Sequence, residues 1–123
     1  MKILLVDDSR TMRNIQKKVL EALGAVEFTE ANDGLEALTA IGGNPDGFAL
    51  ILIDWNMPNM DGITLVGRIR ANDKKTPLIM VTTESEKSRI IDAIKAGVNN
   101  YALKPFTPEV LLQKVKQTLG MAA

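Results

Sequence analysis

Three aspartates stand where two apolar stretches of the chain stop. Lys2–Val6 runs directly into Asp7 and Asp8. Ala49–Ile53, the most hydrophobic stretch, runs into Asp54. If these stretches are neighbouring strands of one parallel sheet, the three carboxylates converge at one edge and repel one another, so that they take up a proton or bind a hard cation. Oxygen ligands without histidine or cysteine favour Mg²⁺, and the pattern therefore predicts a magnesium site.

A hydroxyl group and an ammonium group close two further apolar stretches. Pro77–Thr82 ends in Thr82, and Lys104 comes directly after Tyr101–Leu103. A carboxylate, a divalent ion, a lysine and a hydroxyl together suit an aspartyl-phosphate intermediate. Phosphoryl transfer needs mainly positioning and neutralisation of charge, and these groups provide both.

Each of these residues also has a purely structural interpretation. Asp7 and Asp8 could favour the positive end of a following helix. Asp54 could be a plain turn residue and Lys104 an exposed lysine in a loop. Thr82 could be an ordinary strand residue. Taken one at a time, these alternatives stay open, and only the joint placement of the residues at four strand ends favours a site for phosphoryl chemistry.

Strand-like and helix-like stretches alternate five times along the chain, which predicts an α/β domain with a parallel sheet and helices on both sides. The expected strands are Lys2–Val6, a weaker one around Val26 and Phe28, Ala49–Ile53, Pro77–Thr82 and Tyr101–Leu103. Ligands of such doubly wound sheets bind beyond the carboxyl ends of the strands, where the predicted site residues lie. With no linker or repeat in view, we expect a single domain over residues 1–123.

The expected helices follow capping signals and apolar spacing. They begin near Ser9, Asp33, Gly62, Ile90 and Thr107. The first is expected to end at Gly24, and its apolar stripe consists of Met12, Ile15, Val19, Leu20 and Leu23. Thr107 before Pro108 is a strong start signal, because proline fits the first turn of a helix.

Composition excludes several classes of protein. The 123 residues include 15 basic and 15 acidic ones, so a general affinity for nucleic acid or membrane surfaces is not expected. Hydrophobic residues make up 46% of the chain, but no apolar run approaches the length of a membrane span. The absence of cysteine and histidine removes disulfides, the usual zinc sites and a phosphohistidine on this chain. We expect a cytoplasmic protein.

Five stretches carry a resemblance to a known family: LLVDDSRTMR, EANDGLEAL, ILIDWNMPNMDG, IMVTTES and AIKAGVNNYALKPFTPEVL. They resemble the receiver domains of bacterial two-component signalling, and most of all the stand-alone chemotaxis type. The resemblance implies a flavodoxin-like, doubly wound sheet of five parallel strands in the order 2-1-3-4-5 with five helices. It also implies a monomer that receives its phosphoryl group from a sensor histidine kinase and then binds a protein target, for the chemotaxis type the flagellar motor switch.

The resemblance assigns roles to the candidate site residues. Asp54 would be the phosphoacceptor. Mg²⁺ would be bound by Asp8, Asp54 and the backbone carbonyl of Asn56, with Asp7 acting largely through water. Lys104 would pair with the phosphoryl group. The phosphoprotein would form and lose its aspartyl phosphate by its own catalysis, and it would not be an enzyme acting on other substrates.

Further roles concern signalling. Thr82 would donate a hydrogen bond to the phosphoryl group, and the ring of Tyr101 would swing inward as Thr82 moves. Asn56 and Glu84 would tune hydrolysis of the aspartyl phosphate, while Thr83 stands where many relatives carry alanine. The output would be read at the face formed by the fourth helix, fifth strand and fifth helix.

Three smaller expectations concern local structure. The Lys104–Pro105 bond is expected to be cis, and Trp55 to be a half-exposed loop side chain. The kinase is expected to dock beside the start of the first helix, where Arg10, Met12 and Arg13 lie. Lys87, Arg89 and Lys95 are expected to form a solvated face of the fourth helix.

Three other functions remain as alternatives. Within the family, the chain could be a relay shuttle or a phosphate sink without a motor target. An FMN-binding, flavodoxin-like carrier shares the layer architecture, but its first loop should offer small hydrogen-bond donors to a phosphate, not two carboxylates. A phosphatase with an aspartate nucleophile usually has a second aspartate two residues later, where this chain has Asn56.

Overall fold

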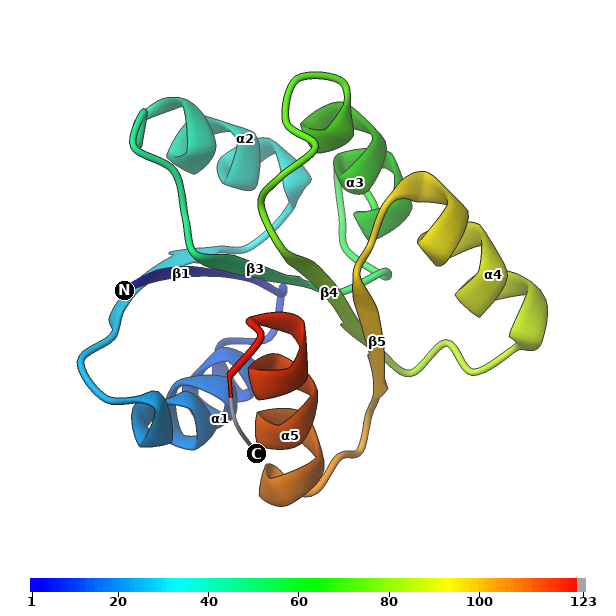
Figure 1. Ribbon diagram of the computed structural model, residues 1–123. Coiled ribbons are helices and arrows are strands. Elements are labelled where there is room, and N and C mark those ends of the chain that lie inside the picture. The colour runs from blue at the N-terminus through cyan, green and yellow to red at the C-terminus, as the bar shows by residue number, and fades with distance from the viewer. Residues whose placement is uncertain (122–123) are drawn as a thin grey trace.

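A computed structural model describes residues 1–121 and contains one five-stranded sheet with helices on both faces (Figure 1). The strands are β1 (Lys2–Val6), β2 (Glu27–Ala31), β3 (Leu50–Ile53), β4 (Leu78–Thr82) and β5 (Asn100–Leu103). The α-helices are α1 (Arg10–Leu20), α2 (Gly34–Gly42), α3 (Gly62–Arg70), α4 (Lys87–Ala96) and α5 (Pro108–Thr118).

All four strand pairings are parallel, and the strand order is β2-β1-β3-β4-β5. The doubly wound α/β fold predicted from the sequence is therefore confirmed. Val6 pairs with Ile53 across β1 and β3, so the residues that follow these strands leave the sheet side by side. Because all strands run in one direction, every strand ends at the same edge of the sheet.

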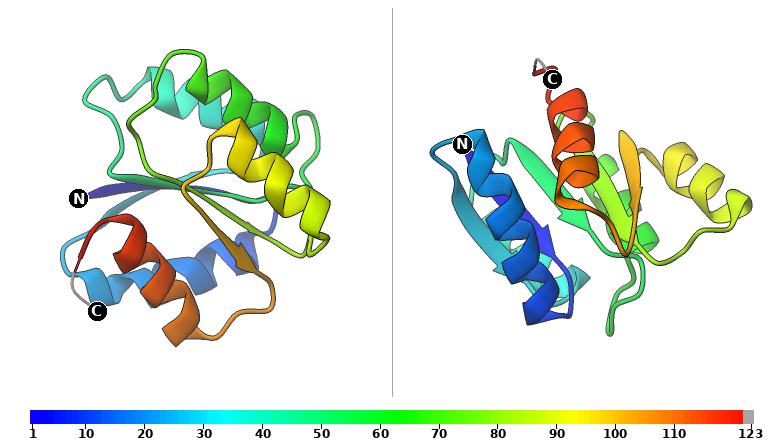
Figure 2. Two further views of the ribbon diagram at one scale, coloured as in Figure 1. Left: turned by 45° about the vertical axis from the view of Figure 1, so that its right-hand side comes forward. Right: turned by 90° about the horizontal axis from the view of Figure 1, so that it is seen from below.

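The helices form two layers around the sheet (Figures 1 and 2). α1 and α5 cover one face, while α2, α3 and α4 cover the other. Each face has its own apolar core, and alternate residues of a strand enter opposite cores: Leu50 and Leu52 pack toward α1 and α5, whereas Ile51 and Ile53 pack toward the other layer. Every residue of β3 and β4 is buried, as expected for central strands without polar alternation.

Side-chain caps define where four of the helices begin. Ser9, Asp33, Asp61 and Thr107 each accept a hydrogen bond from the backbone N–H three residues later. Such caps satisfy N–H groups that have no partner inside the helix. Glu86, which precedes α4, makes no such bond, so α4 begins without a side-chain cap.

The first helix differs from its expected form. α1 ends at Leu20 and continues as a short 3₁₀ turn, Glu21–Leu23, before Gly24 with φ of 105°. Ile15, expected in the apolar stripe, is 43% exposed. The buried face instead carries Arg13, Gln16 and Leu20. The expectation for Ile15 was wrong because the buried face of α1 consists of Arg13, Gln16 and Leu20, and Ile15 lies outside it.

None of the helices within residues 1–121 is long and apolar enough to cross a membrane.

Candidate functional site

The three predicted aspartates come together at the ends of β1 and β3. One carboxylate oxygen from each of Asp7, Asp8 and Asp54 can be chosen so that all three atoms lie within 4.8 Å of one another. The backbone holds two of them in place: the Asp54 N–H donates to the Val6 carbonyl at 2.9 Å, and the Asp7 N–H donates to Ala31 at 3.1 Å. Asp7 and Asp54 are buried, while Asp8 is exposed. The predicted convergence of the carboxylates is thus confirmed.

Lys104 brings a positive charge into the same cluster from the end of β5. Its Nζ lies 2.7 Å from Asp7 Oδ2 and 3.1 Å from Asp54 Oδ2, and all three side chains are at most 12% exposed. Burial by itself would lower the pKa of Lys104, but the hydrogen bond to Asp7 and the charges of both carboxylates outweigh it and raise this pKa. Burial raises the pKa of Asp7, although the bond from Lys104 opposes the shift. The ammonium group therefore stays charged between two carboxylates.

The cluster fits a hard divalent cation. Three carboxylates and one ammonium group leave an excess of negative charge in a partly buried place. Their oxygens are the ligands that Mg²⁺ prefers, and exposed Asp8 leaves one side open for retained water. The Asn56 backbone lies two residues beyond Asp54 in the same loop. These residues could therefore hold a metal ion.

Thr82 ends β4, the strand between β3 and β5. It is fully buried, and its backbone carbonyl accepts a hydrogen bond of 2.9 Å from the Lys104 N–H. Its hydroxyl oxygen accepts a longer bond of 3.4 Å from the Glu84 N–H. Thr82 thus adjoins Lys104 through the backbone, and its hydroxyl faces the start of the β4–α4 segment.

Asn56 and Glu84, the two residues predicted to tune hydrolysis, are bonded to each other, and Tyr101, the predicted switch residue, is bonded to Glu84. Asn56 Nδ2 donates to Glu84 Oε1 at 3.1 Å, which joins the loop after Asp54 to the segment after Thr82. The hydroxyl of Tyr101 donates to the Glu84 backbone carbonyl at 2.6 Å, and its ring is 7% exposed. Burial, together with the negative charge of Glu84, raises the pKa of Tyr101 to about 12. The ring therefore lies inward in this structure.

The structure corrects the sequence interpretation at Trp55. The sequence predicts a half-exposed loop side chain, but Trp55 is 4% exposed and belongs to the core under α2, α3 and α4. The loop turns back at once, because the Gly62 N–H donates to the Trp55 carbonyl at 2.8 Å. Glycine allows this approach, since a Cβ on Gly62 would lie 2.2 Å from the Asp54 carbonyl oxygen. The guanidinium of Arg89 then covers the indole ring at 5.2 Å from its centroid.

Arg13 supports the site from α1, a role that the sequence interpretation did not identify. It lies at the start of α1, beside which the kinase is expected to dock, but its side chain is 7% exposed and turned inward. Its Nη1 donates to the Asp7 backbone carbonyl at 2.5 Å and to Asn32 Oδ1 at 2.9 Å. Its Nε pairs with Glu30 at 2.9 Å. The spacing of Arg13 from buried Gln16 and Leu20 is the signal that could have indicated its inward direction.

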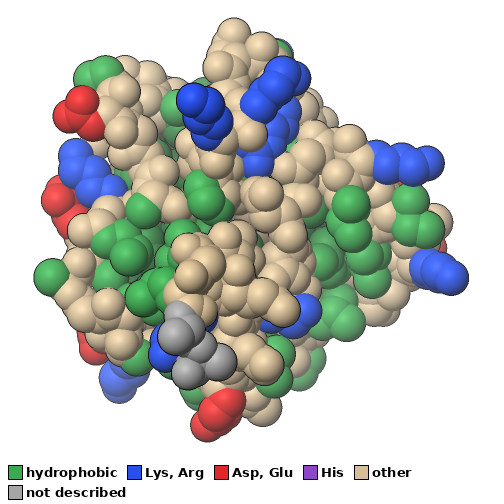
Figure 3. All heavy atoms as spheres, viewed as in Figure 1, with side chains coloured by type: hydrophobic (Ala, Val, Ile, Leu, Met, Phe, Trp, Pro, Cys, Tyr) green, Lys and Arg blue, Asp and Glu red, His purple; other side chains and the backbone are tan. Residues whose placement is uncertain are grey.

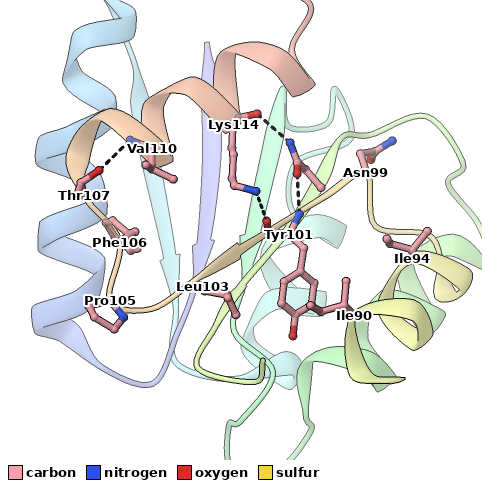
Figure 4. Close-up of a pocket in the computed structure, with 11 residues that line it drawn as sticks. Ile90, Ile94, Asn99, Tyr101, Leu103, Pro105, Phe106, Thr107, Val110 and Lys114 are labelled. Atoms are coloured by element: carbon pink, nitrogen blue, oxygen red, sulfur yellow. Dashed lines mark hydrogen bonds between the residues drawn. The ribbon is translucent and has the colours of Figure 1, made fainter. Parts of the chain in front are cut away.

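An apolar groove of about 610 Å³ lies next to the site, between α4, β5 and α5 (Figure 4). Ile90 and Ile94 come from α4, Tyr101 and Leu103 from β5, and Val110 from α5. The ring of Tyr101 lies beside Ile90 in the groove (Figure 4). On the surface, hydrophobic side chains gather over α4 and β5, flanked by lysine or arginine (Figure 3).

Comparison with known proteins agrees with this arrangement. Residues 3–116 match the response regulator receiver domain family. The chain belongs to this family. It is 51% identical over 122 residues to chemotaxis protein CheY1 of Helicobacter pylori, with 98% of each chain covered. It is 47% identical to chemotaxis protein CheY of Pseudomonas aeruginosa, covering 95% of this chain and 94% of the relative.

Solved structures of other receivers superpose closely on this one. A Francisella response regulator receiver domain is 33% identical and superposes with a TM-score of 0.86. The match covers 97% of this chain and 96% of that one. The Borrelia burgdorferi CheX–CheY–BeF₃–Mg²⁺ complex includes a chain that is 26% identical, with a TM-score of 0.89 and coverage of 95% of this chain and 87% of that one. The CheY-like fold predicted from the resemblance is therefore confirmed.

The receiver fold brings the predicted residues together in two connected groups. Lys104 is bonded to both Asp7 and Asp54, and Asp8 adjoins them. In the second group, Asn56 and Tyr101 are bonded through Glu84, and Tyr101 also lines the groove. The Lys104–Pro105 bond is cis, as expected.

Proposed function

We propose that this chain is a chemotaxis response regulator, a single receiver domain over residues 1–123 that acts in the cytoplasm. Asp54 accepts a phosphoryl group from the phosphohistidine of a sensor kinase, and the phosphorylated protein signals by binding another protein. The observation that carries the proposal is the Lys104 ammonium, placed between Asp54 and Asp7 in a cluster of three carboxylates. Identities of 51% and 47% to chemotaxis proteins support the choice of pathway.

The chemical step is an in-line displacement at phosphorus. A carboxylate oxygen of Asp54 forms the new P–O bond, the P–N bond to the kinase histidine breaks, and its electron pair remains on the imidazole. The Lys104 Nζ, 3.1 Å from Asp54 Oδ2, faces the place where the phosphoryl oxygens arrive and neutralises part of their charge. This chain has no histidine and therefore acts as acceptor in such an exchange.

We propose Mg²⁺ as the cofactor, held by Asp7, Asp8, Asp54 and the Asn56 carbonyl. The bound ion would supply a second positive charge to the phosphoryl oxygens. The hard oxygen ligands and the excess of negative charge in the cluster support this choice. The Borrelia burgdorferi complex, named for both BeF₃ and Mg²⁺, gives a precedent in a protein of the same fold.

The output is a shift between two conformations of the Tyr101 region. The Thr82 hydroxyl would donate to the new phosphoryl group, and this bond would favour the inward position of Tyr101. Changing the populations from 1:99 to 99:1 takes about 5.5 kcal/mol, which a few charge-assisted hydrogen bonds can supply. The groove between α4, β5 and α5 then receives the target, which we propose is the flagellar motor switch. The apolar groove favours such direct output over a role as relay shuttle or phosphate sink.

Hydrolysis ends the signal. The hydrogen bond between Asn56 and Glu84 joins the loop after Asp54 to the segment after Thr82, which supports a role of these two side chains in controlling the access of water to Asp54. We propose that they set the lifetime of the aspartyl phosphate.

The deciding experiment replaces Asp54 by asparagine. The purified variant is incubated with Mg²⁺ and labelled acetyl phosphate, or with a phosphorylated kinase, and retained label is measured. Asp46→Asn is the matched control, because it removes the same charge from an exposed loop. Loss of labelling in Asp54→Asn alone, with an unchanged circular dichroism spectrum, is expected. Undiminished labelling of Asp54→Asn would remove this residue from its role.

A further inference from the structure

Helix α4 buries little of its surface against the rest of the protein. Its buried residue is Ala93, whereas Ile91 is 40% and Ile94 is 56% exposed. It also begins after Glu86 without the side-chain cap that starts the other four α-helices. Because helical stability in proteins comes mainly from packing of one face, the position of α4 depends strongly on contacts at its two ends.

The carboxyl end of α4 is fixed to α3 by Arg70. Its Nε donates to the Gly97 carbonyl at 2.9 Å, and its Nη2 donates to Asn99 Oδ1 at 3.1 Å. The absence of a side chain at Gly97 permits this contact, since a Cβ there would lie 2.7 Å from Arg70 Cγ. Several directed bonds therefore hold this end.

The amino end of α4 meets the acceptor loop through Arg89. Its guanidinium carbon lies 5.2 Å from the centroid of the Trp55 ring, within the range of a cation–π contact. Trp55 follows Asp54 directly and is 4% exposed, so the surrounding core holds its ring in place beneath Arg89. The next residue, Ile90, lies beside the Tyr101 ring (Figure 4). One turn of α4 thus touches both the acceptor loop and the switch tyrosine.

Trp55 is rigidly connected to the acceptor. Gly62 donates to the Trp55 carbonyl at 2.8 Å and packs against the Asp54 carbonyl, which leaves the loop little freedom. A movement of this loop therefore moves the indole ring. Any such movement reaches α4 through Arg89, because its guanidinium stacks on the indole ring. This contact joins two side chains, so it can transmit the movement without breaking a backbone hydrogen bond.

We propose that Arg89 is a positioning residue that joins the acceptor loop to α4 through Trp55, so that the placement of α4 and the state of the Asp54 site depend on each other. The link to the state of the Asp54 site rests on the proposed function, whereas the stack of Arg89 on Trp55 does not. Arg89 is exposed, and its role is therefore to hold α4 in place from the surface.

The first test uses the unmodified protein. Trp55 is the one tryptophan of the chain, so its emission reports on the stack. Arg89→Gln is expected to shift emission to longer wavelength, to increase acrylamide quenching, and to speed amide exchange in residues 87–96 by about two- to fivefold, the equilibrium factor of an exposed cation–π contact. Arg89→Lys should restore part of each effect because it keeps the cation. Lys95→Gln removes the same charge from the same helix and should change none of them.

The second test measures the link to the acceptor. Magnesium and beryllofluoride are added together, and the change in Trp55 emission and in exchange over residues 87–96 is compared between proteins. The response of α4 should shrink about two- to fivefold in Arg89→Gln and persist in Lys95→Gln. Emission and exchange in Arg89→Gln that match wild type in the unmodified protein would overturn the stack. An α4 response equal to wild type would overturn the link.

The two proposals fail separately. If wild type and Asp54→Asn incorporate label equally, the proposed function is wrong, yet the effect of Arg89→Gln on the unmodified protein stands. If labelling depends on Asp54 but Arg89→Gln leaves emission and exchange unchanged, the role of Arg89 is wrong and the proposed function stands.

Discussion

The acidic cluster and the apolar groove meet at the end of β5, where Lys104 lies between the groove residues Leu103 and Pro105, but the two regions are built in opposite ways. In the cluster, Asp7 is 1% and Asp54 is 8% exposed, and Lys104 is bonded to both, so these three charges are enclosed and held in fixed directions. In the groove, Ile94, Leu103 and Val110 are 56%, 43% and 42% exposed. Enclosed charge suits chemistry, which needs groups fixed before reaction. Uncovered apolar surface suits the binding of a protein, which would cover it.

Tyr101 belongs to both regions. Its ring lines the groove, and its hydroxyl is bonded to Glu84, whose side chain is bonded to Asn56 in the loop after Asp54. Substitutions on the two sides should therefore separate according to region: those in the cluster should change stability and phosphorylation, and those in the groove should change binding alone.

The largest expected effect is that of Lys104→Met. It leaves the buried carboxylates of Asp7 and Asp54 without their cation, which should lower the free energy of unfolding by about 3 kcal/mol at pH 7 without magnesium. The pKa of Asp7, already raised by burial, rises further when the bond from Lys104 is lost. A carboxyl group with a raised pKa costs stability as pH increases through that pKa, so the deficit should shrink in acid.

Urea unfolding between pH 4 and pH 8 measures this deficit. Added magnesium should recover part of it through binding to the folded state. The double variant Lys104→Met/Asp54→Asn serves as the control, because it removes one of the repelling carboxylates and should be more stable than Lys104→Met. A deficit independent of both pH and the second substitution would mean that charge is not its cause.

Gly62→Ala should have the next largest effect. The new Cβ would lie 2.2 Å from the Asp54 carbonyl oxygen, so α3 or the acceptor loop must move, at about 1–3 kcal/mol. Gly67→Ala is the matched control in the same helix, where a Cβ meets nothing within 4 Å. It should stabilise by about 0.5–1 kcal/mol, because alanine favours helix more than glycine does.

Urea midpoints and the rate of labelling by acetyl phosphate distinguish these two glycine variants. Gly62→Ala should lower both, and Gly67→Ala should leave the rate of labelling unchanged. Equal behaviour of the pair would show that the approach of α3 to the Asp54 carbonyl is not essential.

The sequence predicted the enclosed region better than the open one. Asp7, Asp54 and Lys104 could be placed together because parallel strands all end on the same side of the sheet, and because the family resemblance implied the order of the strands. Continuous aliphatic runs favour strands that are covered on both faces, and β3 and β4 are fully buried. Side chains that cross between elements were harder to predict, as Arg13 and Trp55 show.

The reason is that these two positions depend on tertiary contacts of particular atoms. Arg13 is buried because the Asp7 carbonyl, Asn32 and Glu30 satisfy its donors. These partners lie on two segments, the end of β1 and the end of β2. Trp55 is buried because Gly62 turns the loop back and Arg89 covers the ring. Apolar spacing in α4 predicted a helix correctly, but it did not indicate that Ile91 and Ile94 stay exposed.

A smaller effect should appear at the residue that both regions share. The pKa of Tyr101 is raised from 10.0 to about 12, so the folded state keeps its proton at a pH where the unfolded chain loses it. The stability that this group contributes is complete below pH 10 and is lost as pH rises toward 12. Wild type should therefore lose stability relative to Tyr101→Phe over this range. Urea midpoints of both proteins from pH 8 to pH 11 test this, and a parallel pH dependence would contradict it.

The smallest change in stability is expected for Ile94→Ser, in the groove. Ile94 is 56% exposed, so its replacement should change the free energy of unfolding by less than about 0.5 kcal/mol. Labelling of Asp54 should also be unchanged, because the residue lies outside the cluster. Binding of the protein captured by the beryllofluoride-activated form should weaken, since a partner loses apolar contact. Leu35→Ser, at a 52% exposed position on α2, is the matched control and should bind normally. If Ile94→Ser instead lost labelling and kept its partner, the division of the molecule into a reacting region and a reading region would be wrong.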